Sequence, residues 1–258
     1  MIKIENPDFS IEQIANSGQC FRINKIGKVW QVIAFSKVLE IKPIRKNAHI
    51  FYCSYEEYQD IWMNYFDFNR DYASIKKSIL EMNDPYLNKA VQYGYGIRIL
   101  KQDLWEIIVS FIISQRNNIS RIKNIIKKLC VPYGNAFPSA NILATYAIED
   151  FTSIGLGYRA QYLADISKAG SIGTLDLEHL KKLDCQEAIM YLKQFNGIGD
   201  KIANCIVLFG LHRIEAFPKD VWINRIIEKY NGNFNIERFK EYAGVVQQYM
   251  FFYQRNLI

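Results

Sequence analysis

Short runs of β-branched and aromatic residues mark the first quarter of the chain. They cover residues 29–35, 38–44 and 49–53 and are separated by turn-forming residues. Such runs predict antiparallel strands joined by hairpins. Proline cannot donate a ladder hydrogen bond, so we expect the strand that contains Pro43 to lie at the edge of the sheet or to end there.

The spacing of apolar residues changes to a helical period after the last of these runs. Ser54 and Glu57 predict a capping box, followed by a helix to about Phe66. Apolar stripes at residues 104–112 and 119–129 predict two more helices. Further helix starts are predicted from N-capping residues, namely Asp84 with Pro85, Ser139, and Asp184 with Glu187.

The succession of the two patterns predicts an α+β fold. We expect a small N-terminal antiparallel sheet domain with flanking helices at residues 1–83 and a larger helical domain at residues 84–258. The 258 residues are 50% hydrophobic and 22% charged, which excludes a disordered or collagen-like chain. The formal net charge of +6 suggests a polyanionic partner without identifying it. The charge is uneven, because residues 98–128 hold seven Lys or Arg against two Asp or Glu.

The cysteines and the apolar segments exclude several classes of protein. No CxxC pair exists, so neither zinc nor an iron–sulfur cluster is predicted, and the odd number of cysteines suggests reduced intracellular thiols. Residues 1–9 lack the apolar run of a signal peptide, and the most apolar helix, at residues 104–114, is too short to cross a bilayer. We therefore expect a cytoplasmic protein without a membrane segment. The cysteines are Cys20, Cys53, Cys130, Cys185 and Cys205.

Two glycines interrupt the helical pattern at residues 195–203. Gly197 and Gly199 flank Ile198, and the apolar period resumes at once, which predicts a helix–hairpin–helix at about residues 187–211. Glycines there allow positive φ and let backbone N–H groups converge beside a helix N-terminus, an arrangement suited to one phosphate. An ordinary loop between packed helices is the alternative.

A lysine and an aspartate stand at the starts of the next two helical patterns. Lys201 follows the expected N-cap Asp200, and an ammonium group is unfavourable at the positive end of a helix dipole. Lys201 is either an ordinary surface lysine or a nucleophile, and a nucleophile must lose its proton in a desolvated pocket. Asp220 ends the Pro-x-Asp loop at residues 218–220, where it can cap a helix and also stabilise a cation.

These residues resemble the helix–hairpin–helix (HhH-GPD) DNA glycosylase superfamily, which combines this hairpin, a lysine just after it and a Pro-x-Asp loop some way downstream. Further blocks resemble the 8-oxoguanine DNA glycosylase branch in order and spacing. The blocks are residues 17–22, 110–119 and 155–160, and Gln247 with Phe251. The sequence departs from the family at Phe195-Asn196, which replaces a common Leu-Pro, and we expect this change to affect packing only.

The resemblance implies a bifunctional enzyme of DNA base excision repair. Such an enzyme flips 8-oxoguanine out of duplex DNA, excises it and nicks the resulting abasic site by β-elimination. The resemblance implies that Lys201 attacks the sugar and forms a Schiff base, while Asp220 stabilises the positive charge that develops on the sugar. This chemistry requires no metal or organic cofactor, and none is predicted.

The resemblance also assigns the binding of the damaged base. The carbonyl of Gly18 would accept a hydrogen bond from N7–H, which 8-oxoguanine has and guanine lacks. Gln247 and Phe251, one helical turn apart, would bind the Watson–Crick edge and stack on the base, and Cys205 would cover the other face. Without the resemblance, a turn glycine and ordinary core positions would explain these residues equally well.

A second set of residues is expected at the opposite strand. In the family, the positions of Arg121 and Arg159 read the cytosine left without its partner, and the position of Tyr158 wedges into the duplex. Arg116, beside Asn117, replaces an asparagine that usually enters the gap, so the preference for opposite cytosine is expected to be altered. The expected phosphate-binding residues are Gly197, Ile198, Gly199 and Trp222, the last standing where some members have a histidine.

The expected partner is double-stranded DNA that contains 8-oxoguanine opposite cytosine, bound by a monomer in the cytoplasm or the nucleoid. We expect the basic helix after Asn118 to lie against this DNA through Lys123, Lys127 and Lys128. Two alternatives stay open: a glycosylase for other modified purines, and a non-catalytic helix–hairpin–helix DNA-binding protein. The combination of Lys201 and Asp220 argues against the second, because a simple phosphate clamp needs neither.

Overall fold

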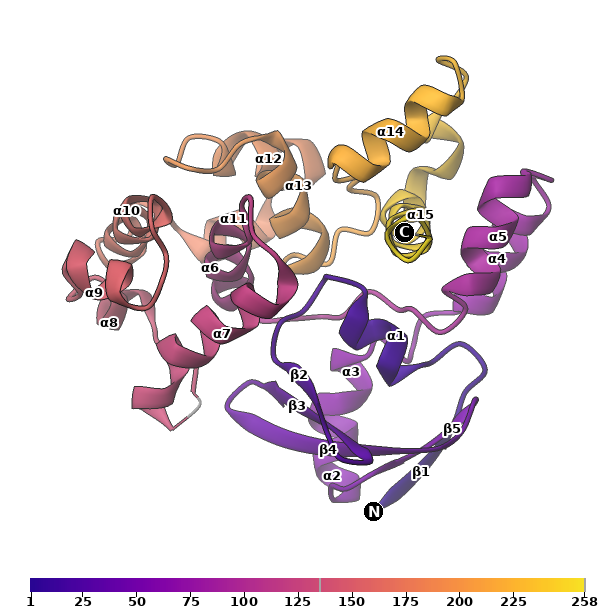
Figure 1. Ribbon diagram of the computed structural model, residues 1–258, viewed down its shortest axis with the longest axis horizontal. Helices are drawn as coiled ribbons and strands as arrows, with labels where there is room; N and C mark the ends of the chain where they lie inside the picture. Colours follow the sequence, from indigo (N-terminus) through magenta and orange to yellow (C-terminus); the bar gives the residue numbers. More distant parts are fainter. Residues whose placement is uncertain (135, 258) are drawn as a thin grey trace.

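The computed structural model describes residues 1–134 and 136–257, and its N-terminal part is built on one antiparallel sheet (Figure 1). The strand order is β1-β5-β4-β3-β2, and every neighbouring pair is antiparallel. The three predicted strands are confirmed as β3, β4 and β5, whereas the apolar runs predict neither β1 nor β2. The strands are β1 (Ile2–Glu5), β2 (Ile23–Ile26), β3 (Val29–Ala34), β4 (Lys37–Arg45) and β5 (Ala48–Phe51).

Pro43 lies inside β4, a central strand, so the prediction of an edge strand or a strand end is wrong. β4 pairs with β3 only as far as Ile41, whose partner is Trp30. Beyond Ile41 it pairs with β5, and the register shifts between Pro43 and Arg45. Pro43 therefore occupies a stretch that is paired on one side, where a missing N–H donor costs little.

A helical segment follows the sheet, as predicted, in three consecutive pieces: α2 (Tyr55–Glu57), the π-helical turn η1 (Tyr58–Trp62) and α3 (Met63–Tyr65). Ser54 Oγ accepts a hydrogen bond from the N–H of Glu57 at 3.1 Å. The Glu57 carboxylate accepts from Trp62 Nε1 at 2.9 Å instead of turning back to the cap. Of the predicted capping box, the structure therefore contains the serine half.

The remainder of the chain is helical, and three predicted helix starts are confirmed by their caps. Asp84 and Ser139 accept N–H bonds from the first turns of their helices, and Asp184 with Glu187 forms a complete capping box. The α-helices are α1 (Ile11–Asn16), α4 (Tyr72–Leu80), α5 (Pro85–Tyr93), α6 (Leu104–Ser114), α7 (Ile119–Cys130), α8 (Ala140–Leu143), α9 (Ile148–Ser153), α10 (Arg159–Ser171), α11 (Leu177–Lys182), α12 (Cys185–Leu192), α13 (Asp200–Phe209), α14 (Val221–Lys229) and α15 (Ala243–Arg255), and the 3₁₀ turns are η2 (Val131–Tyr133) and η3 (Ile236–Tyr242).

The interior contains two apolar clusters. One lies under the sheet and includes Phe51, Trp62 and Phe66. The other surrounds α6, whose apolar side chains are all buried. Because α6 packs against α7, α10 and α13, it holds these three helices in fixed positions relative to one another (Figure 1). The predicted α+β fold is confirmed.

A buried aspartate joins the sheet part to the helical part. The carboxylate of Asp67, which is 2% exposed, accepts hydrogen bonds from Arg70 Nε at 2.8 Å and from the Tyr72 hydroxyl at 3.2 Å. Lys101 Nζ lies 3.2 Å from it and His212 Nε2 lies 3.3 Å from it. His212 follows α13, so one carboxylate connects segments that are far apart in the sequence.

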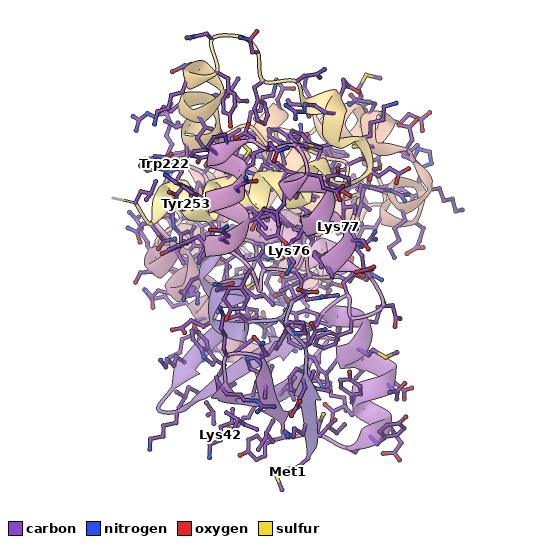
Figure 2. The ribbon with its side chains drawn as sticks, turned by 90° about the vertical axis from the view of Figure 1, so that its right-hand side faces the viewer. Met1, Lys42, Lys76, Lys77, Trp222 and Tyr253 are labelled. Carbon is purple, nitrogen blue, oxygen red and sulfur yellow. The ribbon has the colours of Figure 1, made fainter. Side chains whose placement is uncertain are left out.

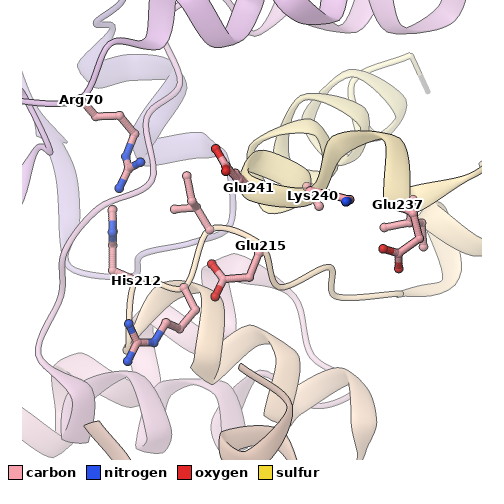
Figure 3. Close-up of a pocket in the computed structure, with 10 residues that line it drawn as sticks. Arg70, His212, Glu215, Glu237, Lys240 and Glu241 are labelled. Atoms are coloured by element: carbon pink, nitrogen blue, oxygen red, sulfur yellow. The ribbon is translucent and has the colours of Figure 1, made fainter. Parts of the chain in front are cut away.

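A cavity of about 610 Å³ opens beside this cluster (Figure 3). Arg70 and His212 line one side of it, and Glu215, Lys240 and Glu241 line other parts. The cavity lies next to the C-terminal end of α13, whereas Lys201 is in the first turn of that helix. A helix of ten residues is about 15 Å long, so the cavity and Lys201 are separate places.

Two further findings concern the cysteines and the apolar helices. All five cysteines are free thiols, as predicted. Among the described residues, no helix is both long and apolar enough to cross a membrane.

Candidate active site and nucleic-acid interface

The helix–hairpin–helix forms as predicted, with α12 before the hairpin and α13 after it. Gly197 has a φ of +82°, and a Cβ atom there would lie 2.4 Å from Cγ of Tyr162. Only glycine therefore lets the hairpin pack this closely on α10. On another side, Gln115 Nε2 donates to the Gly197 carbonyl at 2.9 Å. Two other segments of the chain thus fix the hairpin.

The first turn of α13 begins one residue earlier than predicted. Its N-cap is Gly199, in extended backbone, and Asp200 is the first helical residue, so the prediction of Asp200 as the N-cap is wrong. The Asp200 carboxylate lies 2.5 Å from Lys193 Nζ instead. Lys201 still falls in the first turn, beside backbone N–H groups that have no partner within the helix.

Helices α13 and α14 bring together Lys201, Asp220 and Cys205. These residues are close enough for the charge of one to affect the pKa of another. Asp220 is the N-cap of α14, as predicted, and its Oδ1 accepts from the N–H of Ile223 at 2.8 Å. Burial raises the pKa of Asp220, although backbone donors and the charge of Lys201 act in the opposite direction. Burial also raises the pKa of the Cys205 thiol to about 11, and the charges of both Lys201 and Asp220 act on it. The structure thus brings the two predicted catalytic residues together.

A second group of predicted residues meets where α1 approaches α15. Gly18 follows α1 with a φ of +81°, and a Cβ atom there would lie 3.1 Å from Cε1 of Phe251. Gln247 is buried one turn earlier on α15, and its Nε2 donates to the carbonyl of Pro218 at 3.1 Å. Since Pro218 belongs to the Pro-x-Asp loop, Gln247 connects the predicted base-binding residues to the loop that carries Asp220.

The residues predicted for the opposite strand lie on two loops that contact each other. Arg159 is buried, and its guanidinium donates to the carbonyls of Gln115, at 2.6 Å from Nε, and of Arg116, at 2.9 Å from Nη2. Arg116 itself is exposed with a φ of +44°. Arg159 therefore supports the loop that presents Arg116, and its reading of a cytosine stays a prediction.

The other residues of these loops are more accessible. Tyr158 is 52% exposed, and the Arg159 guanidinium carbon lies 4.5 Å from the centroid of its ring. Arg121 is exposed and donates to the Gly155 carbonyl at 3.1 Å. Asn117 Nδ2 donates to the carbonyl of Ile113 at 3.2 Å, which closes the end of α6. An exposed aromatic ring, with its hydroxyl 3.4 Å from the Gln115 carbonyl next to the exposed Arg116, is compatible with a wedge that enters a duplex.

The remaining predicted phosphate-binding residues differ in exposure. The side chain of Ile198 is buried, so its backbone is the part that a phosphate could reach. Trp222 is half-buried in α14, with the Arg225 guanidinium carbon 5.3 Å from its ring. Trp222 lies in the helical part, away from the sheet end that carries Met1 and Lys42 (Figure 2).

The basic helix α7 does not present all its lysines to solvent. Lys123 Nζ donates to the carbonyl of Ile23 at 2.6 Å, and burial lowers the pKa of Lys123. This side chain ties α7 to the sheet and is half-exposed, and its contact with DNA stays a prediction. Lys127 and Lys128 are exposed, and their contact with DNA stays a prediction.

Sequence reasoning gave no role to Gln115 or Arg255. Gln115 lies inside a block of family resemblance, but its bond to the hairpin depends on the packing of α6 against α13. Arg255 follows Gln247 and Phe251 at successive intervals of four residues, so helical periodicity alone could have placed it on their face.

Family models match most of the chain. Residues 1–108 match the N-terminal domain of 8-oxoguanine DNA glycosylase. Residues 109–243 match the HhH-GPD superfamily of base excision DNA repair proteins, and this segment contains the hairpin, Lys201 and Asp220. The fold and the site thus define a member of the HhH-GPD superfamily. The two matches meet inside α6, and our division of the chain after residue 83 stays a prediction.

Solved structures of similar proteins narrow this class. The structure of MBOgg1 in complex with a low-affinity DNA ligand superimposes with a TM-score of 0.91 at 34% identity, covering 99% of this chain and 95% of that one. The 8-oxoguanine glycosylase/lyase of Clostridium acetobutylicum, in complex with double-stranded DNA containing cytosine opposite 8-oxoG, gives 0.87 at 35% identity and covers 98% and 94%. The chain belongs to the 8-oxoguanine DNA glycosylase family.

A curated relative is longer than this chain. The N-glycosylase/DNA lyase of Saccharomyces cerevisiae is 35% identical over 170 residues, which are 57% of this chain and 45% of the yeast protein. The chain thus matches about half the length of that relative.

Proposed function

We propose that this protein is a bifunctional 8-oxoguanine DNA glycosylase and abasic-site lyase. The observation that carries the proposal is the meeting of Lys201 and Asp220 beside Cys205, at the first turns of α13 and α14. A clamp that only held phosphate would need the hairpin but not a half-buried carboxylate close enough to a lysine for the lysine's charge to act on it. The similarity to two 8-oxoguanine glycosylase structures supports the same conclusion.

The proposed chemistry begins with the uncharged amine of Lys201. Nζ forms a bond to C1′ of the flipped nucleotide as the bond from C1′ to the base breaks, and the base leaves with that electron pair and takes up the proton that the attacking amine loses. Asp220, ionised and held by the N–H of Ile223, stabilises the positive charge that develops on the sugar. The sugar ring then opens: the C1′–O4′ bond breaks, O4′ takes up a proton, and the nitrogen lone pair forms the C1′=N bond of a Schiff base on Lys201. Removal of a proton from C2′ then expels the 3′ phosphate, which nicks the strand.

Selection of the lesion would depend on the group at the end of α1. The Gly18 carbonyl would accept from N7–H of 8-oxoguanine, whereas guanine presents a lone pair there and leaves the carbonyl unpaired. Phe251, in contact with the Gly18 turn, and Cys205, 4% exposed beside Lys201, would lie on the two faces of the base. Gln247 would reach the Watson–Crick edge from its place against Pro218.

The proposed substrate is duplex DNA with 8-oxoguanine opposite cytosine. Arg116, Asn117 and Arg121 would face the opposite strand, with Tyr158 as the wedge. The N–H groups of residues 197–199 and the indole of Trp222 would bind phosphates. We expect the protein to act as a monomer. Because its proposed substrate is chromosomal DNA, we expect it in the cytoplasm or the nucleoid.

Borohydride trapping on an 8-oxoguanine:cytosine duplex tests the proposal. The unchanged protein should form a covalent adduct with the DNA, and Lys201→Gln should abolish it. Lys219→Gln is the matched control, because this exposed lysine lies in the Pro-x-Asp loop one residue before Asp220. An adduct that persists in Lys201→Gln would remove Lys201 from its role.

Parallel duplexes with guanine or an alkylated purine in place of the lesion separate the alternatives. Preferred excision of an alkylated purine would identify a glycosylase of different substrate class. Equal binding to every duplex without excision would indicate a non-catalytic DNA-binding protein.

A further inference from the structure

Arg255 is the last residue of α15 and continues the face that carries Gln247 and Phe251. The three residues are spaced at intervals of four, so their side chains project in similar directions. The guanidinium carbon of Arg255 lies 5.4 Å from the centroid of the Phe251 ring. This arrangement is a cation–π contact to the ring that is proposed to stack on the damaged base.

The same guanidinium reaches across to α1. Its Nη2 donates to the carbonyl of Asn16, the last residue of α1. Its Nη1 lies 3.5 Å from the point where a Cβ atom on Gly18 would stand, and Cε1 of Phe251 lies 3.1 Å from that point. Gly18, Phe251 and Arg255 therefore form one contact group, which we call the Gly18 cluster.

The rest of the Gly18 turn is held from the opposite side. Gln19 Nε2 donates to the hydroxyl of Ser17 and to the carbonyl of Arg98, both at 2.9 Å, and its Oε1 accepts from the N–H of Leu100. These bonds anchor the turn to the segment before α6. On the α15 side, Phe251 packs against the turn and Arg255 donates a hydrogen bond to the Asn16 carbonyl just before it.

The charge of Arg255 is held in an unusual way. No carboxylate pairs with it among residues 1–134 and 136–257, its Nη1 is buried without a hydrogen-bond partner, and burial lowers its pKa. The contacts that offset the charge are the Asn16 carbonyl at the negative end of α1 and the face of the Phe251 ring. A buried donor without a partner still lowers stability, so folding alone gives little reason for an arginine at this position.

We propose that Arg255 is a positioning residue for recognition of the damaged base. It fixes Phe251 of α15 against the Gly18 turn that follows α1. The distance between the Phe251 ring and the Gly18 carbonyl, which would accept from N7–H, is thereby kept constant. This inference rests on the proposed function. The physical reason is that 8-oxoguanine differs from guanine at N7 by one hydrogen. The enzyme can distinguish the two only if the Gly18 carbonyl and the Phe251 ring are held in position to within a fraction of an ångström.

The test compares two substrates that differ in whether they need the Gly18 cluster. One is a duplex with 8-oxoguanine, and the other is the same duplex with a preformed abasic site. Nicking at the abasic site requires Lys201 but has no base to recognise. Arg255→Met should slow excision of 8-oxoguanine on the order of 10–100-fold in single-turnover experiments, because the recognition geometry is loosened. Abasic-site nicking should stay within about twofold of the unchanged protein.

Two further variants sharpen the test. Arg255→Lys keeps a donor for the Asn16 carbonyl but loses the planar face against Phe251, so its excision rate should be intermediate. Arg238→Met is the matched control, since Arg238 also lies over a phenylalanine, 5.6 Å from the Phe239 ring, but is exposed and outside the cluster. It should leave both activities unchanged.

The outcomes separate this inference from the proposed function. Unchanged excision in Arg255→Met, or an equal loss on both substrates, would overturn the positioning role. Failure of the unchanged protein to excise 8-oxoguanine would overturn the proposed function before any variant is compared.

Discussion

The two ends of α13 each lie beside an aspartate, buried in the case of Asp67 and half-buried in the case of Asp220, and the two carboxylates have different hydrogen-bond partners. At the C-terminal end, Asp67 accepts from Arg70 and Tyr72 and is also close to Lys101 and His212. At the N-terminal end, Asp220 accepts from the backbone of α14 and faces Lys201.

The pKa values of the two aspartates move in opposite directions. Burial alone would raise the pKa of Asp67, but the contacts with His212 and Arg70 outweigh it and hold the pKa well below its usual range. For Asp220, burial outweighs the backbone donors and Lys201, and the pKa is raised. A carboxylate whose oxygens are saturated by donors holds segments together, whereas one with spare capacity can respond to a charge that appears during a reaction.

The largest effect is expected on activity, from a change at Asp220, near the N-terminal end of α13. Asp220→Asn should lower the rate of 8-oxoguanine excision by about 10²–10³-fold, because the charge that stabilises the developing cation is lost. Asparagine is a good N-cap, so the melting temperature should not fall. Single-turnover excision and thermal unfolding of the same preparation measure both. Loss of activity together with loss of folding would contradict the assignment of Asp220 to chemistry.

The second largest effect is expected on the stability of the protein, from a change at Asp67, beside the C-terminal end of α13. Asp67→Asn should lower the free energy of unfolding by about 3 kcal/mol, since it leaves buried donors without a charged acceptor. Asparagine tolerates the positive φ of this position, 51°, so the backbone is not the cause of the loss. Chemical denaturation measures the change, and the excision rate per folded molecule should be retained.

The pH dependence of stability should distinguish the two aspartates. The folded-state pKa of Asp67 lies below its unfolded value, so its contribution is present above about pH 4 and is lost as the pH falls toward the folded-state pKa. The stability difference between the unchanged protein and Asp67→Asn should therefore shrink on acidification. Asp220 has the opposite sign, because its pKa is raised in the folded state and protonation relieves the cost of its partly buried charge. A difference for Asp67 that stays constant from pH 7 to pH 3 would contradict this account.

The smallest effect is expected on DNA binding, from loss of the hydrogen bond between Gln115 and the hairpin. Gln115→Ala removes the bond to the Gly197 carbonyl and should weaken DNA binding about fivefold, equivalent to about 1 kcal/mol. Gln194→Ala, an exposed position on the approach to the hairpin, is the control and should bind as the unchanged protein does. Binding curves at one salt concentration are sufficient.

Local signals predicted the elements that depend on neighbours in the sequence. Capping residues placed the starts of α5, α12 and α14, and the glycines of residues 197–199 placed the hairpin. The resemblance added the pairing of Lys201 with Asp220, which the structure brings together. These features are encoded within short segments, so one sequence is enough to find them.

Features that depend on distant segments could not be predicted in this way. The donors to Asp67 come from residues 70, 72, 101 and 212, and no periodicity connects them. Lys123 has the appearance of a surface lysine until α7 is placed against the carbonyl of Ile23. Pro43 is tolerated in a central strand only because β3 ends its pairing at Ile41.

The packing of Gly197 on Tyr162 has a mechanical consequence for DNA bending. Tyr162 belongs to α10, and Tyr158, the proposed wedge, immediately precedes the same helix. The proposed phosphate-binding hairpin therefore packs on the helix that the proposed wedge precedes, and this packing limits how far the two can move relative to each other. A duplex that contacts both the hairpin and Tyr158 has to be bent by an amount that matches the spacing between them. Binding would therefore favour DNA that bends easily, before the damaged base is recognised.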